Sequence, residues 1–230
     1  MNSSQVEFFF SSGYLRLEAF HSKARLAAVR QRLLDETKRL GGTGGVARSI
    51  RKLPVFQQIG RLSAAVKVQH MGEVLMTPGL ISHVSQLTGH TPSDIQDTQL
   101  LLSPPNQGAW TLEGLNWHVD ITAERRDGIP GIQAFFLIDD VAPHGGATLA
   151  LAGSHRVIAQ RKSSPSQIRQ VLRASANPET ALRELGVSII EMCGRVGDVF
   201  LMDMRVLHTP SINATRRVRL MATCRCLFNA

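Results

Sequence analysis

The hexapeptide Leu-Asn-Trp-His-Val-Asp, residues 115–120, is the stretch from which the fold and chemistry of this chain can best be worked out. Side chains two residues apart in an extended strand point the same way, so His118 and Asp120 would present an imidazole and a carboxylate on one face. His208 follows the apolar run 199–202 closely enough to lie at a strand end. Two histidines and one carboxylate on one face of a metal leave the opposite positions open, which is typical of non-haem Fe(II) oxygenases.

The composition is that of a globular protein. A length of 230 residues is enough for one domain with a sizeable core, and 43% hydrophobic with 19% charged residues argue against disorder. No apolar run approaches the roughly 18 residues of a membrane span, and the first residues lack the pattern of a secretory signal. The three cysteines, Cys193, Cys224 and Cys226, suit reduced thiols in a core. We therefore expect a cytoplasmic enzyme.

Helices are expected to come first and strands to follow. Helical spacing of apolar residues predicts helices at 4–12, 22–41, 62–76 and 78–89, with a strand at 14–18. Short apolar or alternating runs between turn residues predict strands at 98–103, 115–120, 132–139, 148–151, 187–192, 199–202 and 217–228. Residues of about 160–186, with Pro165 and Pro178 as helix starts, interrupt these strands as a helical insert.

This pattern predicts a single α+β domain over residues 1–230. Residues 1–95 would form a mainly helical cover, and residues 96–230 would contain a β-barrel or sandwich. The glycine-rich block 41–45 is expected to be a flexible connection between helices. It does not predict a phosphate site, because no strand precedes it and neither the P-loop nor the dinucleotide-binding pattern is matched.

The last predicted strand has two different faces. One face would hold mainly polar residues and the other apolar residues, and the polar face contains Arg217, Arg219, Met221, Thr223 and Arg225. If that face lines a cavity, a buried guanidinium there requires a carboxylate partner, because an unpaired buried charge is very costly. No acidic residue neighbours it in sequence, so a bound dicarboxylate held by a bidentate ion pair is a reasonable partner.

Positive charge is concentrated near the N-terminus. The segment 23–67 contains eleven Lys and Arg residues and only two acidic residues, Asp35 and Glu36. Such a segment is by default a solvated helix face, and its alternatives are a nucleic-acid footprint or an attractor for anionic substrates. We hypothesise that the basic segment from Lys23 to Lys67 folds over the mouth of the site and favours an anionic small-molecule substrate, with charge reversal at Arg48, Arg51 and Lys52 as the test; nucleic acid is the less favoured partner.

Five segments of the chain carry a resemblance to a known family. They are Phe9 to Leu17, Thr77 to Gly89, Trp117 to Asp120, Gly145 to His155, and the stretch from Gly197 through His208 and Asn213 to Arg219. In this order and spacing the chain resembles the phytanoyl-CoA dioxygenase family of Fe(II)- and 2-oxoglutarate-dependent oxygenases. Each motif alone is short, and their order and spacing together make the resemblance specific.

The resemblance implies a double-stranded β-helix, a cupin-like jelly roll, with the N-terminal and inserted helices packed on one face. It implies that His118, Asp120 and His208 are the catalytic, metal-binding residues and that they hold Fe(II). It also implies 2-oxoglutarate and O₂ as co-substrates. Because relatives that halogenate have a small residue in place of this carboxylate, the presence of Asp120 favours hydroxylation.

The same resemblance implies how the co-substrate is bound. Arg219 would pair with the distal carboxylate of 2-oxoglutarate, and Gln99 and Gln133, on strands expected to line the cavity, would add hydrogen bonds. A serine that often touches the co-substrate in the family is replaced here by Pro210, with Thr209 and Ser211 as possible substitutes. Two further departures are Phe135 where many relatives have Trp, which alters pocket shape, and Ala152 where Pro is usual.

The sequence thus predicts a 2-oxoglutarate-dependent, non-haem iron dioxygenase. It would hydroxylate an unactivated C–H bond of a small-molecule metabolite and release succinate and CO₂. Three alternatives stay open: a catalytically silent jelly roll that binds a ligand, a protein that binds nucleic acid through its basic segment, and a zinc hydrolase on the same three ligands. The zinc hydrolase would not need Arg219.

Overall fold

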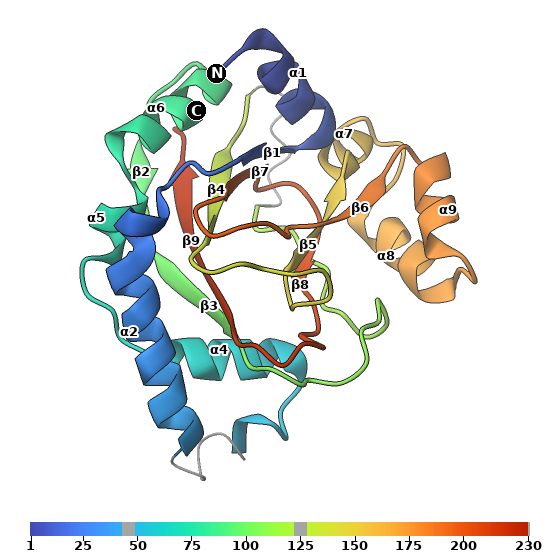
Figure 1. Ribbon diagram of the computed structural model, residues 1–230. Coiled ribbons are helices and arrows are strands. Elements are labelled where there is room, and N and C mark those ends of the chain that lie inside the picture. Colours follow the sequence, from blue (N-terminus) through green and yellow to red (C-terminus); the bar gives the residue numbers. More distant parts are fainter. Residues whose placement is uncertain (43–48, 122–127, 230) are drawn as a thin grey trace.

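The structure is a computed structural model that describes residues 1–42, 49–121 and 128–229, and it contains two antiparallel sheets (Figure 1). The larger sheet has the order β1-β7-β4-β9-β2, with β3 also paired to β9, and the smaller has the order β6-β5-β8. The strands are β1 (Tyr14–Leu17), β2 (Asp94–Ile95), β3 (Gln99–Ser103), β4 (Gly131–Leu137), β5 (Thr148–Ala152), β6 (Ser188–Glu191), β7 (Val199–Asp203), β8 (His208–Pro210) and β9 (Arg219–Leu227). The sheets form an open, not a closed, barrel, which confirms the predicted jelly-roll class.

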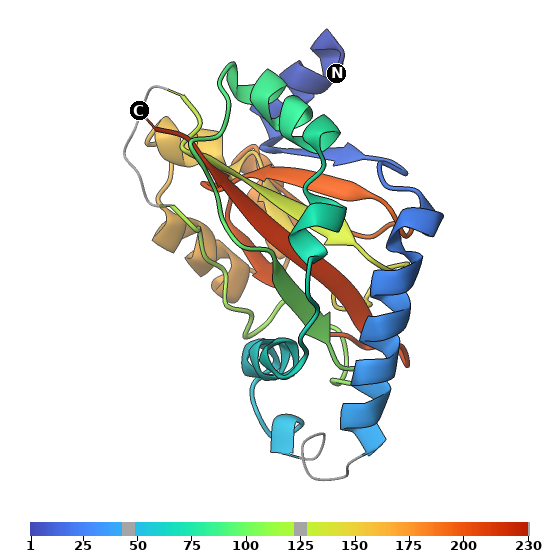
Figure 2. The same ribbon diagram turned by 90° about the vertical axis from the view of Figure 1, so that its left-hand side faces the viewer.

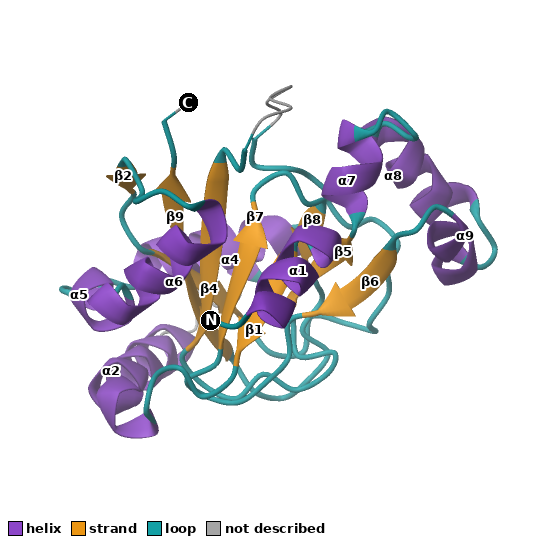
Figure 3. Ribbon diagram, turned by 90° about the horizontal axis from the view of Figure 1, so that it is seen from above, coloured by secondary structure: helices purple, strands orange, loops and turns teal. Residues whose placement is uncertain are grey.

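Helices cover the outer sides of both sheets, whereas the sequence analysis expected the N-terminal and inserted helices on one face. They are α1 (Ser3–Ser12), α2 (Lys23–Gly42), α4 (Val55–Ala65), α5 (Met71–Leu75), α6 (Pro78–Thr88), α7 (Ser154–Ala159), α8 (Pro165–Ala174) and α9 (Pro178–Glu184). Figure 2 shows α5 and α6 in front of the larger sheet. Seen from above in Figure 3, α2, α5 and α6 lie on one side of the strands, and α7, α8 and α9 on the other.

The hydrophobic core follows these layers. One apolar cluster joins the N-terminal helices to the outer face of the larger sheet, and it includes Leu26, Leu80 and Phe136. A second cluster lies between the two sheets, and a third joins the smaller sheet to α7, α8 and α9. Each sheet is therefore buried on both faces, which explains why β4, β5 and β7 are buried along their whole length.

Strand β9 has the two faces that the sequence predicts. Leu220, Ala222, Cys224 and Cys226 belong to the outer apolar cluster. The alternate residues, from Arg219 to Arg225, face the space between the sheets. The three cysteines are free, as predicted.

Gly197 and Asp198 attach the N-terminal strand to the barrel. The carboxylate of Asp198 accepts hydrogen bonds from the Ala19 N–H at 2.8 Å and from the Arg16 guanidinium at 2.7 Å. Gly197 accepts a hydrogen bond from the His21 N–H at 2.9 Å. These contacts fix β1 along the edge of β7, to which it pairs from Tyr14 to Leu17.

Two predicted elements are wrong. Residues 115–120 do not form a strand: their ladder contact is an isolated bridge between His118 and His208. The predicted helix 62–76 is two helices, because the chain is extended at Val66 (φ −103°, ψ 128°) and restarts at His70. The β-branched residues Val66 and Val68 favour this extended link, and both line a cavity.

Four further expectations concern the division of the chain, the glycine-rich block, the inserted helices and membrane spans. The division into a helical cover and a β core within one domain stays a prediction. Of the expected flexible connection 41–45, residues 41 and 42 belong instead to the last turn of α2, and residues 43–45 lie outside the described residues. Helices do occur where the insert was predicted, starting at Pro165 and Pro178. Within the described ranges, no helix has the length and apolar character needed to cross a membrane.

Gly197→Ala should destabilise the protein more than Gly186→Ala. Both glycines have positive φ, +98° and +75°, a conformation that costs a residue with Cβ about 1–2 kcal/mol. A Cβ at Gly197 would also collide with the His21 carbonyl oxygen, whereas one at Gly186 meets open space. Urea unfolding should therefore show a further loss of about 1–3 kcal/mol for Gly197→Ala. Equal losses for the two variants would contradict this close approach.

Candidate active site

A reciprocal pair of backbone hydrogen bonds brings the two histidines together. The His118 N–H donates to the His208 carbonyl at 3.0 Å, and the His208 N–H donates to the His118 carbonyl at 2.9 Å. The Asp120 N–H donates to the Met204 carbonyl at 3.1 Å, which holds the next residues against the turn before β8. The three predicted side chains therefore converge, although 115–120 is not a strand.

Both imidazoles are oriented by the same kind of contact. His118 Nδ1 lies 2.9 Å from the Asn116 carbonyl oxygen, and His208 Nδ1 lies 3.0 Å from that of Val206. A carbonyl can only accept, so each Nδ1–H donates to it, and Nε2 is the atom of each ring that remains available to a metal. Burial lowers the pKa of His208 below its usual value, so its ring is neutral at pH 7. Neutral imidazoles with a fixed Nδ1–H are the form that binds metals.

The carboxylate of Asp120 completes the donor set. Its Oδ1 accepts a hydrogen bond from Arg225 Nη2 at 3.1 Å, while its buried Oδ2 has no hydrogen-bond partner among the described residues and lies 3.8 Å from His208 Nε2. One ligand atom from each of His118, Asp120 and His208 lies within 4.8 Å of the others. Since such atoms bond a metal at about 2.0–2.2 Å, the unpaired oxygen and two imidazole nitrogens fit a divalent transition metal. Among the described residues, no other His, Cys, Asp and Glu cluster meets this criterion.

The triad lines a cavity of about 530 Å³ that opens between α4 and the larger sheet. The cavity is also lined by Arg219, Gln99 and Gln133, so the structure brings all the predicted site residues to one space. Gln133 is 3% exposed and its Oε1 is buried without a partner, whereas Gln99 is exposed.

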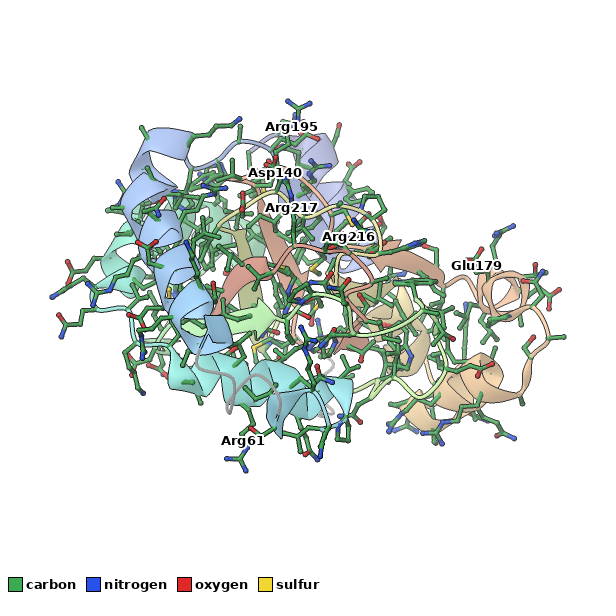
Figure 4. All side chains as sticks on the ribbon, turned by 60° about the horizontal axis from the view of Figure 1, so that its bottom comes forward. Arg61, Asp140, Glu179, Arg195, Arg216 and Arg217 are labelled. Atoms are coloured by element: carbon green, nitrogen blue, oxygen red, sulfur yellow. The ribbon has the colours of Figure 1, made fainter. Side chains whose placement is uncertain are left out.

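Arg219 is the buried charge without a partner. It is 3% exposed, and its Nε, Nη1 and Nη2 atoms have no hydrogen-bond partner within the described part of the chain. Burial lowers its pKa to about 9, so the guanidinium stays charged at neutral pH. Its neighbours Arg216 and Arg217, labelled in Figure 4, are exposed. Because an unpaired buried charge costs several kcal/mol, this end of the cavity suits an anion.

The hydroxyl residue beside Pro210 is Thr148, which the sequence analysis missed. Thr148 pairs with Pro210 across β5 and β8, and both line the cavity. The expected substitutes are occupied elsewhere: Ser211 donates to the Ala147 carbonyl at 2.8 Å, and Thr209 donates to the Pro210 carbonyl. A search for hydroxyls near Pro210 in sequence could not find a residue that only the sheet places there.

One face of α4 forms the outer wall, which was also missed. Phe56, Ile59, Gly60 and Ser63 recur at helical spacing and line the cavity, and the Ser63 hydroxyl accepts a hydrogen bond from the Leu102 N–H at 2.9 Å. In the sequence, this helical spacing of residues predicts a helix that faces the interior. The spacing alone does not show whether that interior is a packed core or a cavity.

Part of the basic segment 23–67 covers the site, because α4 forms the outer wall, but Arg51 and Lys52 do not line the cavity. Arg51 lines a separate cavity beside α2, and Lys52 lines neither cavity, while Arg48 lies outside the described residues. Several other basic side chains have partners at the surface, as in the Arg30–Asp139 pair at 2.9 Å. Lys67 is the exception, because it lines the same cavity as the triad.

Comparison with known proteins identifies the family. A family model described as phytanoyl-CoA dioxygenase matches residues 9–221. The chain belongs to the phytanoyl-CoA dioxygenase family. The resemblance carried by its motifs is thereby confirmed, and this phytanoyl-CoA dioxygenase family member is an enzyme of the non-haem iron, 2-oxoglutarate-dependent oxygenases. No match to it was found among curated proteins.

Solved structures share the fold of this phytanoyl-CoA dioxygenase family member at low sequence identity. EctD from S. alaskensis with 2-oxoglutarate and 5-hydroxyectoine has a TM-score of 0.63 and 19% identity, over 99% of this chain and 76% of that one. AviO1 from Streptomyces viridochromogenes Tue57 has a TM-score of 0.60 and 15% identity, over 100% and 96%. The non-heme alpha ketoglutarate dependent carbocyclase SnoK from nogalamycin biosynthesis has a TM-score of 0.54 and 13% identity, over 99% and 84%.

Arg219→Met should make the ligand-free protein more stable. The change replaces an unpaired buried charge by an apolar side chain, which should raise the free energy of unfolding in urea by about 1–4 kcal/mol. The exposed Arg217→Met is the matched control and should change it by less than about 0.5 kcal/mol. With Mn(II) present, 2-oxoglutarate should raise the Tm of the wild type and of the control but not that of Arg219→Met. An Arg219→Met variant that is less stable than the wild type, and whose Tm still rises when 2-oxoglutarate is added, would contradict an anion-binding role.

Proposed function

We propose that this oxygenase hydroxylates a small molecule, with His118, Asp120 and His208 as the iron ligands. One observation carries the proposal: a cavity lined by three convergent donor atoms is also lined by a buried arginine, Arg219, that has no partner in the described part of the chain. A dicarboxylate that reaches from the donors to Arg219 satisfies both. When bound, iron, 2-oxoglutarate and O₂ would supply the oxidising chemistry: one oxygen atom of O₂ would convert a C–H bond into C–OH, and the other would enter succinate as the co-substrate loses CO₂.

Each residue of the site then has a defined task. The Nε2 atoms of His118 and His208 and the free Oδ2 of Asp120 hold the metal. The guanidinium of Arg219 binds the distal carboxylate of 2-oxoglutarate, preferably in the bidentate geometry that its planar fork allows. The amides of Gln133 and Gln99 add hydrogen bonds, and the hydroxyl of Thr148 takes the place of the serine that Pro210 replaces.

The remaining walls exclude water and admit the substrate. Phe135 is buried on the inner face of β4, and Phe56 and Ile59 of α4 lie across the open side. An apolar wall around the reacting centre keeps water away and strengthens the electrostatic contacts inside. Lys67 at this opening supports an anionic group on the substrate. The cytoplasmic location stays a prediction.

The other candidate functions are supported less well. A silent ligand-binding barrel gives no reason for two imidazoles with free Nε2 atoms beside an unpaired carboxylate oxygen. A zinc hydrolase does not use Arg219. Binding of nucleic acid is disfavoured because basic side chains of the described segment, such as Arg30 and Arg39, form ion pairs with acidic residues. Salt-sensitive association with DNA or RNA would be its signature.

Succinate formation tests the function. The wild type, loaded anaerobically with Fe(II) and 2-oxoglutarate and then exposed to O₂, should release succinate, and candidate metabolites that are substrates should accelerate the release. Asp120→Ala removes a metal ligand and should lower the rate at least about 100-fold. Arg61→Met is the control, because Arg61 projects from α4 away from the protein (Figure 4) and should not matter. If the wild type, Asp120→Ala and Arg61→Met release succinate at the same rate, the proposed function is wrong.

A further inference from the structure

We propose that Arg225 is a positioning residue that makes Asp120 a ligand through one oxygen only. The proposal rests on the function proposed above, in which Asp120 holds the metal. Arg225 would act by holding Oδ1 on the side away from the histidines, so that Oδ2 alone faces them.

The two oxygens of the Asp120 carboxylate have different surroundings. Arg225 Nη2 donates to Oδ1 at 3.1 Å, whereas Oδ2 is buried, has no hydrogen-bond partner among the described residues, and lies 3.8 Å from His208 Nε2. The side chain of Asp120 is 9% exposed. The carboxylate is thus already divided into a protein-bound oxygen and a free oxygen.

The backbone of Arg225 is held on both edges of β9. Arg225 lies in β9 opposite Gln133 of β4, and its carbonyl accepts a hydrogen bond from the Gln96 N–H at 2.9 Å on the other edge of the strand. Its side chain is 30% exposed, and its Nε is buried. This pairing fixes the point from which the side chain of Arg225 reaches Asp120.

Arg225 and Arg219 share one face of β9 but have different tasks. Six residues of strand place their Cα atoms about 20 Å apart, so one guanidinium cannot stand in for the other. Arg219 has no protein partner among the described residues, which leaves it for a ligand. Arg225 already has an acidic partner in the protein, which identifies it as support for the metal site.

Single-oxygen binding matters for the chemistry that the site can host. Carboxylates bind metals through one or both oxygens, and the two-oxygen mode occupies one more coordination position. A site that must accept a chelating co-substrate and O₂ needs three open positions beside its three ligands. By holding Oδ1, Arg225 keeps that position open, and its charge also offsets the cost of burying the carboxylate.

The test measures metal binding directly. Wild type, Arg225→Met, Arg225→Lys and Arg225→Gln are compared with the exposed control Arg61→Met, each first checked for folding by circular dichroism. Anaerobic calorimetry with Fe(II) alone should show a dissociation constant about 10–100-fold larger for Arg225→Met than for the wild type. This is the usual effect of removing a residue that hydrogen-bonds to a metal ligand. Arg225→Gln keeps an N–H donor and Arg225→Lys keeps a charge, so both should recover part of the affinity. Arg61→Met should match the wild type.

Co(II) absorption supplies a second readout that a purely structural role would not change. Substitution of Arg225 by Met should alter the intensity and position of the Co(II) visible bands, because the carboxylate can then bind through both oxygens. If Arg225→Met binds Fe(II) as tightly as the wild type and gives the same Co(II) spectrum, the positioning role is overturned, and a raised KM for an anionic substrate would assign Arg225 to substrate binding.

The same data separate the two proposals. A wild type that binds no Fe(II) and forms no succinate overturns the proposed function and this role with it. A wild type that binds iron and forms succinate, together with an Arg225→Met variant of unchanged iron affinity and unchanged spectrum, overturns this role alone. If Arg225→Met does not fold, Arg225→Gln and Arg225→Lys decide the question by the same two measurements.

Discussion

The backbone pairing of His118 with His208 is the constraint on which the site depends. Residues 115–120 form no strand, so the reciprocal hydrogen bonds at 3.0 and 2.9 Å are what hold this segment beside β8. β8 in turn is paired to β5 in the smaller sheet. Because each histidine positions the backbone of the other, the two imidazoles keep their relation even though β4, β5, β6 and β7 lie between them in the chain.

The cavity interrupts an otherwise apolar core, and the interruption has an energetic cost. Residues between the sheets are mainly apolar, such as Phe200 and Met202, but the inner face of β9 also carries two arginines, Arg219 and Arg225. Arg219 is buried and has no partner among the described residues, while Arg225 pairs with Asp120. The fold leaves the charge of Arg219 for the dicarboxylate that is expected there. It pairs the charge of Arg225 with the carboxylate of Asp120, a proposed metal ligand. A natural protein keeps such a feature where the site requires it.

The sequence predicted the site better than the local structure around it. The spacing of His118, Asp120, His208 and Arg219 and the two faces of β9 depend on residue type and period, which a sequence displays directly. The strand at 115–120 was wrong because alternation alone does not show whether a neighbouring strand is available to pair. The helix at 62–76 was wrong because apolar spacing continues across the extended link.

Contacts between segments far apart in the chain could not be predicted at all. The hydrogen bond from Arg225 to Asp120 joins positions 105 residues apart, and Thr148 reaches Pro210 only through the register of the smaller sheet. Each of these residues has an ordinary local sequence. Their roles come from the way the sheets pack, which short-range patterns do not encode.

Anomalous X-ray scattering at the iron edge, from crystals grown anaerobically with Fe(II), tests the central claim most directly. The account predicts one strong peak within bonding distance of His118 Nε2, His208 Nε2 and a single oxygen of Asp120. No peak at this position, or iron bound only elsewhere on the protein, would contradict it.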